Sequence, residues 1–162
     1  MTRWQINQRF SDKKRVGCNI VQGISIFVDE LRIKINFILR VKEKIVKEKE
    51  DLKDLIVSGM KEKKATNITI IDLKSIKNAV ADYFIICTGG SDTQIDAIAD
   101  SIEEEVYKGI AQNPWRKEGK TNKEWILLDY VQVVAHVFKR DRRQFYGLEE
   151  LWGDAKIINI ED

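Results

Sequence analysis

The chain has 162 residues, of which 43% are hydrophobic and 33% are charged, which is typical of one globular domain with room for an appendage. This composition excludes a largely disordered chain, because such chains have too few apolar residues to form a core. The two cysteines, Cys18 and Cys87, stand in no CxxC or Cys/His cluster, and this favours a reducing cytoplasm and predicts no metal site. No apolar run of about 18 residues occurs, so we expect no transmembrane helix and no membrane partner.

The net charge of +2 is divided unequally along the chain. Residues 1–41 hold eight basic and three acidic residues (+5), which leaves 20 basic and 23 acidic residues (−3) for residues 42–162. A domain that binds nucleic acid through phosphates is normally clearly basic. The charge of residues 42–162 therefore favours a basic protein as the partner, and we expect no specific nucleic acid there.

Residues 1–41 form an atypical basic N-terminal extension to a main domain that we place at residues 42–162. Ile33, Ile35 and Phe37 alternate with polar residues, which predicts a short strand around residues 33–37. Three other interpretations stay open: a disordered segment, a transit peptide, or a segment outside the translated protein, which would then begin at Val41.

From residue 42 the hydrophobic pattern becomes regular. It predicts an amphipathic helix at 42–63, a β-branched strand at 67–73, and a nearly continuous apolar strand at 82–88, which is typical of a strand covered on both faces. Gly89 and Gly90 then turn the chain into a helix, which Ser91 and Gln94 open with the spacing of a capping box and Asn113-Pro114 ends.

The remaining pattern predicts a hairpin of strands at 125–129 and 133–138, one short helix at 140–152 and a last strand at 156–160. The order is therefore helix, two strands, helix, two strands, helix, strand. Such an order predicts an α/β fold with a single mixed β-sheet flanked by helices.

The turn at Gly89-Gly90-Ser91 is the first candidate for chemistry, because free amides at a helix start can bind phosphate. The motifs GxGxxG and GxxxxGK[ST] are absent. A nucleotidyltransferase would need a following strand with two carboxylates for metal ions, whereas the acids at that distance, such as Asp100, fall in the expected helix. We therefore expect neither an enzyme nor a cofactor. A nucleotide-binding or nucleotidyltransferase-like enzyme that uses Gly89–Ser91 remains the alternative.

The only histidine, His136, shares a face of its expected strand with Val134 and Phe138. A hydrogen bond to Asp129 across the hairpin is conceivable, and Ser91 could approach through the fold. Catalysis would need a nucleophile or substrate group beside them, and the sequence specifies none. A structural or interface histidine is the preferred interpretation.

Aromatic residues gather between Trp115 and Trp152. On the last expected helix, Phe145, Leu148, Glu149 and Trp152 recur at helical spacing. Some of these side chains build the core, yet Trp and Tyr are also enriched at binding hot spots. The basic-aromatic motif of RNA-binding sheets is missing.

Several motifs in order resemble the ribosome silencing factor (Iojap-related) family. Residues 82–89 (DYFIICTG), followed by Ser91, Gln94 and residues 97–100 (AIAD), resemble its first signature. Trp115-x-x-x-Gly119, then residues 125–130 (WILLDY), 133–138 (VVAHVF) and 146–155 (YGLEELWGDA), resemble the second, and together the match spans about residues 44–160.

The resemblance implies a nucleotidyltransferase-like fold without the catalytic carboxylates. It also implies binding to the universal large-subunit ribosomal protein fourteen, on the face that meets the small subunit. Occupying that face would block subunit joining and lower translation when nutrients are scarce. Family members form homodimers when free, and organellar relatives act in large-subunit assembly, which keeps an RNA-contacting assembly factor as a further alternative.

Carried over by position, the docking surface comes from the hairpin and the terminal helix. Acidic side chains would meet Lys or Arg of the ribosomal protein, and aromatic ones would form the desolvated centre. Two departures from the family are Val131-Gln132, where Gly-Asp is frequent, and Ala135, where Val is frequent, so the hairpin turn is expected to differ. The expected surface residues are Trp125, Asp129, His136, Tyr146, Leu148, Glu149 and Trp152.

Overall fold

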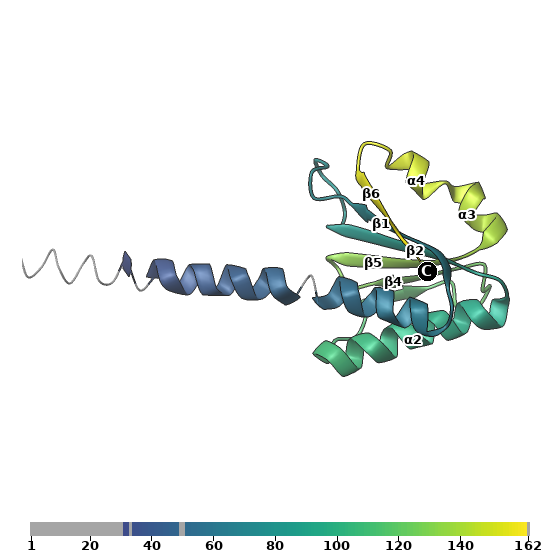
Figure 1. Ribbon diagram of the computed structural model, residues 1–162, viewed down its shortest axis with the longest axis horizontal. Coiled ribbons are helices and arrows are strands. Elements are labelled where there is room, and N and C mark those ends of the chain that lie inside the picture. The colour runs from purple at the N-terminus through teal and green to yellow at the C-terminus, as the bar shows by residue number, and fades with distance from the viewer. Residues whose placement is uncertain (1–30, 33, 49–50, 162) are drawn as a thin grey trace, which may run out of the picture. The chain divides into compact units, whose positions relative to one another are not determined.

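The computed structural model describes residues 31–32, 34–48 and 51–161 (Figure 1). The chain divides into two compact units, Met1–Ile45 and Val46–Asp162, and each is described by itself. Within the described ranges, no helix is long and apolar enough to cross a membrane.

In the first unit, the described residues 31–32 and 34–45 are helical. The short strand predicted around residues 33–37 is therefore wrong. The alternation covered only a few residues, and Ile35, Ile38 and Ile45 also fit helical spacing. Residues 1–30 lie outside the described part, so the expectations about a transit peptide, disorder or a later start remain predictions.

The second unit is built on one six-stranded sheet in the order β3-β4-β5-β2-β1-β6. β2 and β5 are parallel, and the other neighbouring strands are antiparallel. The predicted single mixed sheet flanked by helices is confirmed. Besides a helical segment at residues 51–62, the elements are β1 (Thr66–Asp72), β2 (Tyr83–Gly89), α2 (Asp92–Ile110), β3 (Arg116–Glu118), β4 (Trp125–Asp129), β5 (Val133–Lys139), α3 (Arg140–Tyr146), α4 (Leu148–Leu151) and β6 (Lys156–Ile160).

Two elements differ from the sequence prediction. β3 was not predicted, because its three residues are charged and exposed and have no hydrophobic pattern. The single helix expected at 140–152 is two short helices, because Gly147 has a φ of 52° and its amide donates to the Arg143 carbonyl to end α3.

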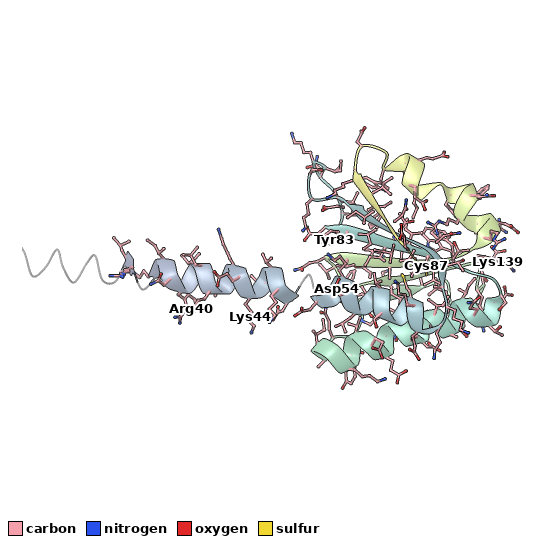
Figure 2. The ribbon with its side chains drawn as sticks, in the orientation of Figure 1. Arg40, Lys44, Asp54, Tyr83, Cys87 and Lys139 are labelled. Atoms are coloured by element: carbon pink, nitrogen blue, oxygen red, sulfur yellow. The ribbon has the colours of Figure 1, made fainter. Side chains whose placement is uncertain are left out.

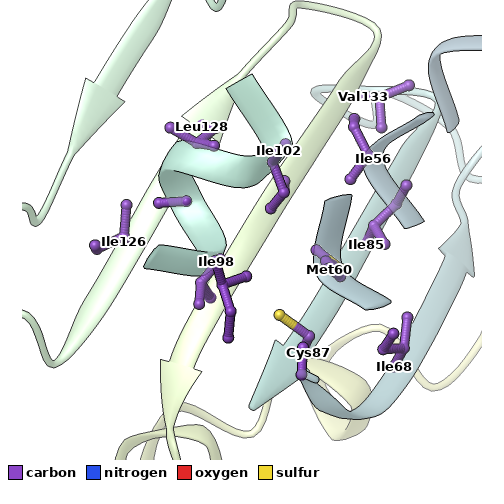
Figure 3. Packing of buried hydrophobic residues seen from close by; sticks show 14 of the residues in the cluster. Ile56, Met60, Ile68, Ile85, Cys87, Ile98, Ile102, Ile126, Leu128 and Val133 are labelled. Atoms are coloured by element: carbon purple, nitrogen blue, oxygen red, sulfur yellow. The ribbon is translucent and has the colours of Figure 1, made fainter. Parts of the chain in front are cut away.

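A buried cluster lies on each face of the sheet. On the first face, the helical segment 51–62 and α2 cover the strands with side chains such as Ile56, Met60, Ile98 and Ile102 (Figure 3). The second face carries Ile71, Leu73, Ala81, Phe84, Ile86, Val134, Phe138 and Ala155, against which Trp125, Leu127, Leu148 and Trp152 pack. Every residue of β2 is buried, as expected for a strand covered on both faces.

Cys87 of β2 belongs to the first cluster and is fully buried. Burial raises the pKa of its thiol to about 12. The thiol is therefore protonated at neutral pH and acts as a small apolar core residue, as the sequence predicted.

The start of α2 is hydrogen-bonded to the residues that follow the helical segment 51–62. Ser91 Oγ accepts from the Gln94 amide at 3.2 Å, as a capping box requires, but Gln94 Oε1 accepts from the Gly90 amide rather than from that of Ser91. Gln94 Nε2 also donates to the carbonyls of Lys63 and Lys64, at 3.0 Å each. One side chain thus joins the two helices that cover the first face.

The hairpin between β4 and β5 turns at Val131, which has a φ of 71°. This is the left-handed region, which a β-branched residue adopts only under strain and glycine adopts freely. Asp129 Oδ1 accepts from the Val131 amide at 2.6 Å and holds the turn. The departure from the family's Gly-Asp therefore places a strained residue where glycine would fit.

We expect Val131→Gly to stabilise the protein by about 0.5–1 kcal/mol. Relief of left-handed strain contributes about 1–2 kcal/mol, and the more flexible unfolded chain offsets part of it. Val131 is exposed, so little apolar burial is lost. The urea midpoint of unfolding measures the effect. Gln132→Gly, at an exposed neighbour without positive φ, is the control and should be destabilising. A lower midpoint for Val131→Gly would show that Val131 is not strained.

Candidate functional site

The β4–β5 hairpin places a group of aromatic side chains on the second face of the sheet. The antiparallel register sets Trp125 opposite Phe138 and Leu127 opposite His136. The Trp125 ring stacks on Phe138 with centroids 4.9 Å apart and on His136 with centroids 5.7 Å apart. Trp125 Nε1 donates to His136 Nδ1 at 3.2 Å. The side chains that alternate on these two strands thus form one aromatic group.

The helices after β5 complete this group. Tyr146, the last residue of α3, lies 4.6 Å from the Trp125 ring and is 45% exposed. Leu148 and Trp152 pack against the same buried cluster, where the Trp152 ring meets Phe84 edge-on. The structure therefore brings together five of the predicted surface residues: Trp125, His136, Tyr146, Leu148 and Trp152.

His136 lies beneath this group and is 4% exposed. Burial lowers the pKa of its imidazole to about 4. Because Nδ1 accepts a hydrogen bond, the neutral ring carries its proton on Nε2, which is buried and has no hydrogen-bond partner among the described residues. The hydrogen bond to Asp129 that the sequence allowed is not formed. The preferred interpretation of His136 as a structural histidine fits this position.

The two predicted acidic residues both bind within the chain. Asp129 accepts from the Val131 amide in the hairpin turn. Glu149 pairs with Arg143, whose Nε and Nη2 lie 2.8 Å and 2.6 Å from the same carboxylate oxygen. One oxygen of each carboxylate thus already has a partner within the chain, and their contacts with a basic partner remain a prediction.

Arg143 was missed by the sequence analysis and joins distant elements. Besides Glu149 it donates to Thr69 Oγ1 and Thr88 Oγ1, at 2.9 Å each, and to the Asn67 carbonyl. Thr69 and Thr88 are buried polar residues in otherwise apolar strands, and that pattern is the one sequence signal for such a network. A cavity of about 1000 Å³ lies beside them, between α3, α4 and the ends of β1 and β6.

Two backbone amides at the turn before α2 are occupied by side chains. The Gly90 amide and the Gln94 amide are bound by the side chains of Gln94 and Ser91. Asp92 pairs with Lys139, which is labelled in Figure 2 at the end of β5. None of Gly89, Gly90 and Ser91 lines the cavity beside Arg143. These contacts occupy two of the amides that a phosphate could otherwise use.

Three acids of α2 that could have served a metal are paired with lysines. Lys120 lies 2.6 Å from Asp100, Lys123 lies 2.9 Å from Asp96, and Lys117 pairs with Glu103. The hydrogen bond from Lys123 lowers the pKa of Asp96. In the part of the chain that the structure describes, no three or more His, Cys, Asp or Glu side chains are grouped to hold a metal ion.

We expect the imidazole of His136 to titrate with a midpoint near 4 rather than near 6.5. As the pH falls, the unfolded chain takes up a proton on this histidine at a higher pH than the folded chain does. The free energy of unfolding therefore falls between pH 6.5 and about 4, by up to about 3 kcal/mol, and is not reduced by this group above pH 6.5. Since the chain has one histidine, a single set of NMR ring signals reports the midpoint. His136→Gln should flatten the stability profile between pH 6.5 and 4. A midpoint near 6.5 would show that His136 is solvated.

Comparisons with known proteins identify the family of the second unit. The family described as "Ribosomal silencing factor during starvation" matches residues 46–162. A ribosomal silencing factor of Halalkalibacterium halodurans is 38% identical over 116 residues, 69% of this chain and 94% of the relative. One of Bacillus subtilis is 41% identical over 100 residues, 62% of this chain and 83% of the relative.

A crystal structure of a protein from Bacillus halodurans aligns with a TM-score of 0.57 at 34% identity, covering 70% of this chain and 99% of that chain. The family match covers the whole second unit, including the aromatic group and both helices of the first face. The resemblance seen in the sequence motifs is confirmed, and the chain belongs to the ribosomal silencing factor family.

Proposed function

We propose that this protein represses translation by binding the large ribosomal subunit and blocking its association with the small subunit. The family match over residues 46–162 carries this proposal, together with relatives named ribosomal silencing factor. The protein acts by occupying a surface and not by catalysis, in the cytoplasm, when nutrients are limiting. The occupied Gly89–Ser91 turn and the paired acids of α2 are consistent with that mode.

The docking surface is the aromatic group of the second face together with α3 and α4. Phe145, whose ring meets that of the half-exposed Tyr146 edge-on, is 74% exposed, and Leu151 of α4 is 71% exposed. Exposed apolar side chains packed side by side mark interaction sites, and Trp and Tyr are the side chains most enriched at hot spots. His136 and Trp152 support this surface from below, where they contact Trp125 and Phe84.

The partner on the large subunit is the universal large-subunit ribosomal protein fourteen. A basic ribosomal protein suits the charge of −3 on residues 42–162 better than bare RNA does. In the free state the protein forms a homodimer, which would keep apolar surface from water until the ribosome is bound. The RNA-contacting assembly factor stays the second candidate, because the basic residues of 1–41 would suit phosphates.

We expect Tyr146→Ala to weaken binding to purified large subunits by about tenfold or more, because truncating a hot-spot aromatic costs about 2 kcal/mol. Trp125→Ala should weaken binding at least as much, although it also removes the donor to His136. Co-sedimentation with large subunits measures the affinity.

Tyr107→Ala is the matched control, because Tyr107 is a 57% exposed tyrosine on α2, the helix of the opposite face. It should bind like the unchanged protein. Melting temperatures separate lost binding from lost folding. Normal binding by both Trp125→Ala and Tyr146→Ala would place the docking surface elsewhere.

We expect removal of residues 1–41 to leave large-subunit affinity within about twofold, because the family match begins at residue 46. Affinity should also fall only modestly between 50 and 200 mM salt, since few phosphates are neutralised. The same co-sedimentation assay at both salt concentrations tests this. A loss of binding on deletion, with a steep salt dependence, would favour the RNA-contacting assembly factor.

A further inference from the structure

We propose that Arg143 is a positioning residue for the docking surface, and that Glu149 acts as its anchor on α4 and not as a contact to a basic partner. The inference rests on the proposed ribosome binding and changes the role of one residue expected at that surface. It is carried by the geometry of α3, α4 and the three strand ends beside them.

α4 needs an anchor outside itself. It has four residues and follows Gly147, whose left-handed φ of 52° breaks the path of α3. A single helical turn is not stable alone, and the break means that helix continuity does not set the direction of α4. Leu148 and Trp152, at either end of α4, contribute to the surface, so their placement depends on what holds this turn.

Arg143 is itself held firmly on the sheet. β1 has an irregular register between Thr66 and Thr69, and Asn67 there has a φ of 51°. Such an irregularity leaves a carbonyl outside the regular strand pairing, and the Asn67 carbonyl accepts from Arg143 Nη1. Asparagine adopts this backbone conformation more readily than most residues. The bend of β1 thus creates one of the acceptors that Arg143 uses.

The guanidinium group reaches two strands directly with its remaining donors, and a third strand through Thr69. Thr69 of β1 and Thr88 of β2, which are 4% and 2% exposed, accept from Nη2 and Nη1. Thr69 Oγ1 in turn donates to Asn159 Oδ1 of β6 at 3.2 Å. An arginine has five N–H donors in a rigid plane, and only arginine can fill this set of acceptors.

Glu149 connects Arg143, and through it the strands, to α4. The side chains of Arg143 and Glu149 are 15% and 26% exposed, so the pair is largely shielded from water. Both contacts with Arg143 use the same oxygen of Glu149, so a lysine or arginine of a partner that approached this oxygen would compete with Arg143. The neighbouring Glu150 is an exposed carboxylate on the same turn, which makes it the matched comparison.

The test compares Arg143→Lys, Glu149→Gln, the double variant and Glu150→Gln in the full chain. Equilibrium binding to purified large subunits is measured at two salt concentrations, and hydrogen exchange reports the amides of Leu151 and Trp152, which bond to Gly147 and Leu148. Arg143→Lys and Glu149→Gln should each weaken binding about tenfold and speed exchange in α4. The double variant should bind no worse than the more weakly binding single variant, because both single variants disrupt the same Arg143–Glu149 pair.

Glu150→Gln should bind within about twofold of the unchanged protein, and the salt dependence of binding should be the same for Glu149→Gln and the unchanged protein. If Glu149→Gln lowers the salt dependence, leaves exchange unchanged and is not reproduced by Arg143→Lys, Glu149 is a direct contact and the proposal is wrong. Normal binding by both single variants would overturn it as well. If the protein without substitutions does not bind large subunits, the proposed function fails. The anchoring is tested separately, because hydrogen exchange in α4 that stays the same in Arg143→Lys would refute it.

Discussion

The parallel pairing of β2 with β5 sets where the other parts of the second unit lie. Its register places Thr88 beside Phe138 and Gly89 beside Lys139, so both strands end at the same edge of the sheet. α2 begins just beyond β2, and α3 begins just beyond β5. The ion pair of Lys139 with Asp92 joins these two helix starts. The helices that cover the two faces therefore begin at the same end of the central strands.

The two faces are then covered to different extents. The helical segment at 51–62 and the 19-residue α2 cover the first face, where the core side chains are almost wholly buried. The second face is covered by two short helices of seven and four residues. Short helices bury little apolar area, so their attachment depends more on polar contacts such as those of Arg143. The same incomplete cover leaves Trp125 and Tyr146 partly open to solvent.

Much of the sheet could be predicted because its strands carry local patterns. A few neighbouring residues are enough to recognise the continuous apolar run of β2 and the short hairpin between β4 and β5. The Ser91 cap is also local. By contrast, Arg143 binds groups 55 to 76 positions away in the sequence, which no local pattern reveals. The break at Gly147 was missed because the helical spacing of the aromatic residues continues across it.

The same limit explains why the two acidic residues were given outward roles. A sequence shows that Asp129 and Glu149 are charged and flank aromatic residues, but not that an amide and a guanidinium already bind them. With both carboxylates engaged, the acidic side chains left around the docking surface are exposed ones, namely Asp141, Glu150 and Asp154. Exposed charges mainly raise the rate of association with a basic partner, whereas buried aromatic contacts slow dissociation. The exposed acids at the rim of this surface thus attract the partner, and the aromatic side chains at its centre hold it. The internal pairs of Asp129 and Glu149 keep the rim and the centre in shape.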